Sequence, residues 1–348
     1  MRLGIGEKAK SVIAWAVRER NTEPTVRRLT AAQLSIVAQP LTLERDKHYV
    51  QVRLKSLRIV NSRIAWKKYY GCIHTNATLA DSRTGEAQFQ SISTPSKLAG
   101  PDPKHADRIL LKDVPVLGPV PYRGGNMTVE IGLFAVQSSD LAEPFLDVLM
   151  TMSKAAGVSF VTAAAPFVEP LKKGAERLLG LENHSTLAVG LAHGFSPVET
   201  GYYLVTDAPS HLVDGSSLRF DESFRLQFEK NDKLADYPYF VFSIEAETRR
   251  ADWASIPDLR SAHDSLRALL HDPKTTSAKA EEAYTFFKRL ALTSPDLVGA
   301  DADTLVAEEN ARLQKAFGQG RAVAGRKKGF DIGPFESLGL YATPSGTA

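Results

Sequence analysis

Cys72 and His74 are the side chains whose types and spacing come closest to a catalytic pair. They stand two residues apart in YYGCIHTN, so on a strand they would face the same side, about 6–7 Å apart. A thiolate nucleophile also needs a base within hydrogen-bond distance, which the fold usually supplies from elsewhere in the chain. Because free cysteine is among the most often buried residue types, we interpret the pair as structural.

The eight histidines are scattered along the chain. No two have the i, i+4 spacing that directs two imidazoles of a helix at one metal ion. A hydrolase site could be assembled from the loop pairs His105 with Asp107 and His211 with Asp214. Four carboxylates could gather around Ca²⁺, although they lack the spacing of a ligand loop: Asp207, Asp214, Asp221 and Glu222.

The chain contains none of the common catalytic or nucleotide-binding signatures, such as G-x-x-x-x-G-K-[ST], G-x-G-x-x-G, H-E-x-x-H or G-x-S-x-G. Its single cysteine excludes an internal disulfide. We therefore predict no catalytic residues, no metal site and no cofactor, and we favour a protein that is not an enzyme.

A basic stretch, residues 47–71, is the most informative feature of the sequence. Residues 1–75 carry 15 Lys and Arg but only 5 Asp and Glu, although the net charge of the whole chain is only +3. Cations and aromatic side chains on one sheet face suit an anionic surface such as a lipid headgroup layer. The candidate residues for binding such a surface are Lys47, Arg53, Lys55, Arg58, Arg63, Trp66, Lys67, Lys68 and Tyr69.

The same cations could instead form a solvated strand face that protects a sheet edge, or could dock on acidic helices of the chain itself. A nucleic-acid partner is not favoured, because a dedicated binder usually has a strongly basic domain. The sequence leaves these alternatives open.

The elements that would position these residues are mostly strands. Val50, Val52 and Leu54 alternate with polar residues, and the change of phase at Leu57 predicts a bulge near Ser56. STLAVGLAHGF (185–195) also reads as a strand, Val213–Gly215 predicts a hairpin turn, and residues 224–228 alternate as a half-exposed strand. We expect an α+β fold with a β-rich, sandwich-like body over residues 31–250.

A helical hairpin is predicted to interrupt this body at residues 140–180. It contains fourteen consecutive uncharged residues, 155–168. As one helix they would span only about 21 Å, short of the roughly 30 Å hydrocarbon core. We therefore predict a buried core segment, with insertion into a membrane as the alternative.

The two ends of the chain complete the predicted organisation. Residues 1–30 are predicted to form an amphipathic helix and a basic linker, and 251–318 to form three helices ending at Gly318. Residues 319–348 form a Gly-rich basic tail. No secretory signal is apparent, so we expect a cytoplasmic location, with peripheral membrane association as the alternative.

Together these features predict a non-enzymatic binding or scaffolding protein whose partner is another protein. Two alternatives remain at this point. One is peripheral association with anionic membranes through residues 47–71, and the other is a hydrolase with a site assembled from dispersed His and Asp residues. The sequence does not predict the oligomeric state.

Overall fold

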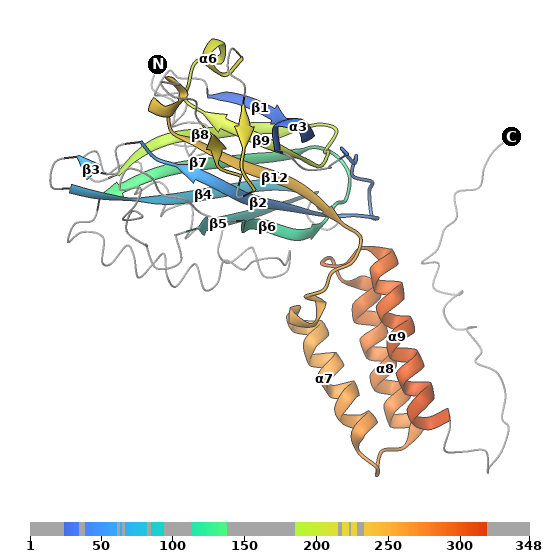
Figure 1. The fold of residues 1–348 in the computed structure, drawn as a ribbon. Helices are drawn as coiled ribbons and strands as arrows, with labels where there is room; N and C mark the ends of the chain where they lie inside the picture. Colours follow the sequence, from blue (N-terminus) through green and yellow to red (C-terminus); the bar gives the residue numbers. More distant parts are fainter. Residues whose placement is uncertain are drawn as a thin grey trace, which may run out of the picture.

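The structure is a computed structural model that describes residues 24–34, 39–60, 63–64, 67–81, 85–93, 113–137, 185–214, 218–222, 224–227 and 233–318. Two antiparallel sheets are packed face to face, and a bundle of three helices extends from one end of them (Figure 1). The α+β class and the sandwich-like body with a C-terminal three-helix segment are confirmed.

The first sheet has the strand order β1-β9-β12-β2-β6, and every pair in it is antiparallel. Its strands are β1 (Thr25–Leu29), β9 (Gly201–Thr206), β12 (Tyr239–Glu247), β2 (Tyr49–Arg58) and β6 (Val114–Pro121). Strand β1 falls in a stretch that the sequence assigned to a basic linker. Two adjacent arginines, Arg27 and Arg28, break the alternation of apolar and polar residues by which a strand is recognised. In the structure each of them pairs with a carboxylate.

The second sheet has the order β5-β4-β7-β8, and the short strand β3 pairs with the start of β4. Its strands are β3 (Arg63–Ile64), β4 (Lys67–Asp81), β5 (Gly85–Ser93), β7 (Met127–Gln137) and β8 (Ser185–Phe195). Asp81, the last residue of β4, pairs with Gly85, the first residue of β5.

The main core lies between the two sheets, where inward side chains of both form one buried cluster. Val52 and Leu54 of β2 belong to it, so the predicted alternation is confirmed. The predicted bulge is also confirmed: Ser56 lies opposite Val241 and Leu54 opposite Phe242, which leaves Lys55 as the extra residue of β2.

A smaller apolar cluster covers the outer face of the first sheet. It is built from α3 (Ala31–Leu34), α6 (Ser210–Asp214), a 3₁₀ turn η1 (Lys233–Asp236), and the strand pair β10 (Arg219–Phe220) and β11 (Leu226–Gln227). The hairpin predicted at Val213–Gly215 is wrong, because Val213 and Asp214 end a short helix. The hairpin turn lies at residues 221–225 instead, where Asp221 Oδ1 accepts a hydrogen bond from the Arg225 N–H.

The predicted half-exposed strand at 224–228 is only partly formed. Strand β11 begins at Leu226, because Phe224 has a φ of 55°, in the left-handed region that no strand residue adopts.

Three helices form the C-terminal bundle: α7 (Pro257–His271), α8 (Ser277–Thr293) and α9 (Gly299–Gly318), preceded by a 3₁₀ turn η2 (Trp253–Ser255). Leu259, Ala262 and Leu266 of α7 are buried against the other helices, as their spacing predicted. Helix α9 ends at the predicted Gly318. Among the described helices, none is both long and apolar enough to cross a bilayer.

Several predictions lie outside the described residues. They are the N-terminal amphipathic helix, the helical hairpin at 140–180, the pair His105 and Asp107, and the Gly-rich tail at 319–348.

Candidate functional site

Lys55, a predicted surface-binding residue, is held inside the protein. Its side chain is only 7% exposed, and its Nζ lies 2.6 Å from Asp113 Oδ1 and 2.7 Å from Glu245 Oε1. The ammonium also lies over the rings of Tyr202 and Phe224, 5.9 and 5.5 Å from their centroids. Burial opposes the charged form, but the hydrogen bonds to Asp113 and Glu245 outweigh it and raise the pKa of Lys55.

Three other predicted cations are also engaged or buried. Arg53 Nε donates to Asp113 Oδ1 at 2.7 Å, and Lys47 Nζ donates to Glu44 at 2.5 Å. Arg58 is buried. Strands β3 and β4 contain Arg63, Lys67, Lys68 and Tyr69, whose side chains lie outside the described part, as does Trp66. Binding of an anionic surface by this stretch stays a prediction.

His74 points away from the main core and is buried beside Gln90, with its Nε2 3.2 Å from Gln90 Oε1. Burial lowers the pKa of His74 from 6.5 to about 4. An imidazole with so low a pKa is neutral near pH 7 but is a weak general base. The Cys72 side chain is outside the described part, so the interpretation of this residue as structural is not tested.

The candidate acidic residues are spread over three places: Asp207 directly follows β9, Asp214 ends α6, and Asp221 and Glu222 lie in the turn before β11. Asp214 pairs with Arg27 of β1, and Asp221 pairs with Arg225. His211 lies on the same short helix as Asp214. Within the described residues, no group of three or more His, Cys, Asp and Glu side chains is placed to hold a metal ion.

A polar junction that the sequence did not predict joins the sandwich to the bundle. The Arg250 side chain is 0% exposed. Its Nη1 donates to the Asp296 carbonyl at 3.1 Å and its Nε to Asp252 Oδ1 at 2.8 Å. The guanidinium lies 6.0 Å from the ring centroid of Tyr49. Arg250 therefore connects the end of the sheet to the loop before α9.

Tyr49 of β2 and Asp301 of α9 complete this junction. The Tyr49 hydroxyl donates to Asp301 Oδ2 at 2.8 Å and accepts from the Val298 N–H at 3.0 Å. The same carboxylate oxygen accepts from the Arg250 backbone N–H at 2.8 Å. Burial raises the pKa of Tyr49, which keeps its hydroxyl protonated as a donor.

Arg123 adds a second connection from the turn that Gly124 and Gly125 form, both with positive φ. Its Nη2 donates to the carbonyls of Pro295 and Leu297, at 3.2 and 3.0 Å. Except for Arg250 and Asp252, these partners are far apart in the sequence, so no local pattern could have identified the junction. It fixes how the bundle is held against the sandwich.

Three edges of the two sheets are protected against further pairing. Strand β1 is short and carries Arg27 and Arg28. Strand β6 contains three prolines, which have no N–H to donate. Strand β5 approaches β6, since Ser91 Oγ donates to the Val116 carbonyl at 2.7 Å. These are common devices that prevent unwanted strand addition.

Strand β8 is the exception. Its eleven residues, Ser185–Phe195, include no Lys, Arg, Asp or Glu, and among the described strands it pairs only with β7. Most of the strand is buried or half-buried, but Ala192, His193 and Gly194 at its C-terminal end are exposed. The sequence predicted this strand but not its place at the edge of a sheet. Within the described residues, this edge has no charged side chain of its own to protect it.

A hollow of about 320 Å³ adjoins the exposed end of β8. It is lined by residues of β1, β8, β9 and the loop between β8 and β9: Arg28, His193, Gly194, Phe195, Ser196, Pro197, Glu199 and Tyr203. Phe195 packs edge-to-face against His193 and Tyr203, with centroid distances of 4.7 and 5.2 Å.

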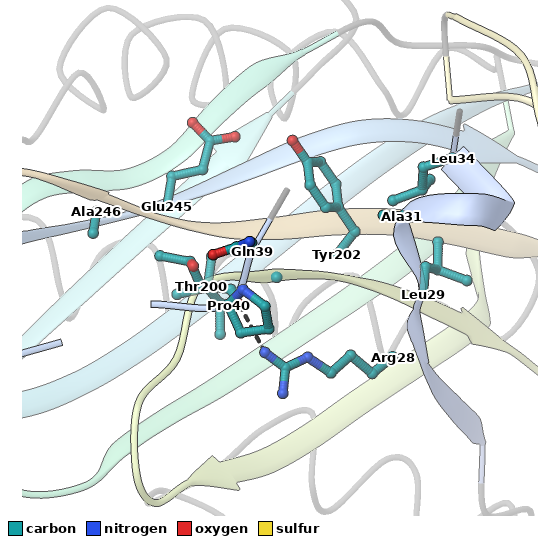
Figure 2. A pocket seen from close by; sticks show the side chains of 12 residues that line it. Arg28, Leu29, Ala31, Leu34, Gln39, Pro40, Thr200, Tyr202, Glu245 and Ala246 are labelled. Carbon is teal, nitrogen blue, oxygen red and sulfur yellow. Dashed lines mark hydrogen bonds between the residues drawn. The ribbon is translucent and has the colours of Figure 1, made fainter. Parts of the chain in front are cut away.

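Arg28 separates this hollow from a second one of about 310 Å³, which is bordered by β1, β9 and β12. Arg28 Nη1 donates to Glu199 Oε2 at 2.7 Å, and Arg28 Nη2 donates to the Thr200 carbonyl at 2.8 Å. The second of these bonds is drawn in Figure 2. Figure 2 also shows Tyr202 and Glu245 side by side on the far side of the second hollow. A Cβ on Gly201 would lie 3.1 Å from Arg28 Nε, so the absence of a side chain at this position leaves room for the Arg28 side chain.

Comparison of the chain with protein-family models, curated proteins and solved structures finds no match in any of the three.

Proposed function

We propose that the protein is a non-enzymatic binding or scaffolding protein, and that it holds another protein by strand addition at the exposed end of β8. The observation that carries this proposal is the contrast among the sheet edges: β1, β5 and β6 are protected, whereas β8 carries no charged side chain along its length. In strand addition, an extended segment of the partner supplies the missing backbone donors and acceptors.

The junction around Arg250 supports a scaffolding role. Its buried hydrogen bonds tie the sheet to the bundle, so that a partner held at β8 would have a fixed position relative to the helices. The neutral His74 and the internal ion pairs of Lys55 make structural contributions that require no reaction. The proposal therefore assigns binding and no catalysis.

Co-purification from the native host at low and high salt tests this function. The full chain should be compared with His193→Lys and with Thr128→Lys. His193 shares the inward face of β8 with Leu191 and Phe195, and an inward lysine on an edge strand opposes pairing. Thr128 is an exposed residue of β7 opposite Gly194, so a lysine there adds the same charge at the same end of the sheet but not on the edge strand, and it provides the matched control.

We expect a protein partner that wild type and Thr128→Lys retain at high salt and that His193→Lys loses. A partner retained equally by both variants would place the contact elsewhere and refute strand addition at β8. A chain that retains no protein under either condition would refute the binding function itself.

A further inference from the structure

The hollow beside β8 lies where a side chain of an added strand would point. Side chains of a strand alternate between the two faces of a sheet. Leu191, His193 and Phe195 occupy the inward face of β8, opposite Ile131, Val129 and Met127 of β7. A segment paired with the exposed end of β8 would direct every second side chain to this face, into the hollow between β8 and β1.

The charges at this hollow are already balanced. Arg28 and Glu199 both line it, and their side chains pair at 2.7 Å. A charged side chain from a partner would have to compete with this ion pair, at the cost of its own desolvation. The hollow therefore favours a neutral occupant.

The surfaces of the hollow favour an aromatic ring over an aliphatic group. His193, Phe195 and Tyr203 supply three rings that already pack edge-to-face. The guanidinium of Arg28 is held by Glu199 and the Thr200 carbonyl and adds a planar cation of the kind that packs on aromatic faces. The volume of the hollow, about 320 Å³, is at the small end of the range for ligand sites, roughly 300–1,000 Å³. This size suits one large side chain.

From this geometry we infer that the partner segment is an uncharged extended peptide with one aromatic residue, whose side chain fills the hollow formed by Arg28, His193, Phe195 and Tyr203. This inference rests on the proposed strand addition at β8. Backbone pairing gives the contact its affinity, and the hollow gives it specificity for the aromatic position.

The test is selection of a displayed library of random eight-residue peptides against the full-length protein. The selected sequences are then made as synthetic peptides in three forms. The first is unmodified, the second has its aromatic residue replaced by alanine, and the third is a series methylated on one backbone nitrogen at a time. Binding to wild type, His193→Lys and Thr128→Lys is measured by calorimetry.

We expect the selected peptides to share an uncharged stretch with one aromatic residue. Replacing that residue by alanine should weaken binding about ten- to hundredfold, from the loss of one buried ring. Methylation should abolish binding at alternate nitrogens only, because every second N–H of an added strand faces the edge. His193→Lys should weaken binding at least about tenfold, and Thr128→Lys should leave it nearly unchanged.

The two ideas fail in different ways. Alternate sensitivity to methylation without an aromatic requirement would overturn the inference about the hollow and leave strand addition in place. Binding that shows no alternation would overturn strand addition, and the inference with it. A selection that enriches no peptide would also overturn both.

Discussion

The junction between sandwich and bundle and the exposed end of β8 have opposite chemistry. At the junction, Arg250 is fully buried and bonded to groups of the loops before α7 and α9. At the end of β8, Ala192, His193 and Gly194 are exposed, and the strand carries no charged side chain. The first region is closed by polar contacts, and the second is open and neutral.

This difference teaches which contacts hold the fold and which are available to a partner. A buried charge contributes to stability only while its partners stay in place, so the junction is sensitive to substitution. An exposed strand end contributes little to stability, because its backbone groups can bond to water when no partner is present. The predictions below test this contrast, from the largest expected effect on stability to the smallest.

The largest effect is expected at the junction. Arg250→Met removes the donors that satisfy the Asp296 carbonyl and Asp252, and with them the charged side chain that is fully buried in the junction. We expect a loss of about 3–5 kcal/mol in the free energy of unfolding. Denaturant unfolding followed by circular dichroism measures it.

Arg260→Met is the control for this prediction. Arg260 of α7 pairs with Asp264, and both side chains are mostly exposed, at 70% and 67%. Its loss should cost below about 1 kcal/mol, as is usual for exposed ion pairs. Equal losses in the two variants would show that burial at the junction does not determine its contribution.

The next effect concerns another buried polar group, His74. Its pKa is about 4 in the folded protein against 6.5 for an unperturbed histidine. Because the folded value is the lower one, the contribution is full above pH 6.5 and is lost as the pH falls toward 4. The loss amounts to about 3 kcal/mol.

Other carboxylates titrate in the same range, so the measurement is a comparison with His74→Asn. The unfolding free energies of the two proteins should be measured at pH 7.5 and pH 4.5. Wild type should lose more stability on acidification than the variant. An identical pH dependence would mean that His74 is not buried in the neutral form.

A smaller effect is expected for Tyr49→Phe. This change removes one hydroxyl, which leaves the Val298 N–H without its acceptor and Asp301 without one donor. A buried donor left unpaired costs about 1–3 kcal/mol. Denaturant unfolding of Tyr49→Phe and Arg250→Met, measured side by side, shows which variant loses more free energy of unfolding. A larger loss in Tyr49→Phe would contradict the central role of Arg250.

Whether a feature of the fold could be predicted depends on how far apart in the sequence the residues that determine it lie. The alternation of Val50, Val52 and Leu54, the bulge at Lys55 and the end of α9 at Gly318 depend on neighbours in the sequence, and they were predicted. The hairpin at Val213–Gly215 failed because a turn pattern fits the end of a short helix equally well.

The junction and the hollow could not be predicted, because they depend on contacts between distant residues. Tyr49 and Asp301 are 252 residues apart, and ETRRAD around Arg250 has the composition of an exposed linker. The sequence likewise does not say which strands are edges, since the order β1-β9-β12-β2-β6 is not the chain order. Lack of charge in β8 became informative only once its position in the sheet was known.

The smallest effect on stability is expected at β8 itself. His193→Lys and Thr128→Lys replace exposed side chains. We expect Thr128→Lys to change the free energy of unfolding by less than about 0.5 kcal/mol, and His193→Lys, which also loses the ring contact with Phe195, by about 1 kcal/mol or less. Denaturant unfolding of the two variants beside wild type measures this. If His193→Lys destabilises the fold by more than about 2 kcal/mol, the end of β8 belongs to the closed part of the molecule and the contrast with the junction is lost. If stability is unchanged while the partner is lost, the binding effect cannot come from unfolding, and β8 acts through its exposed surface.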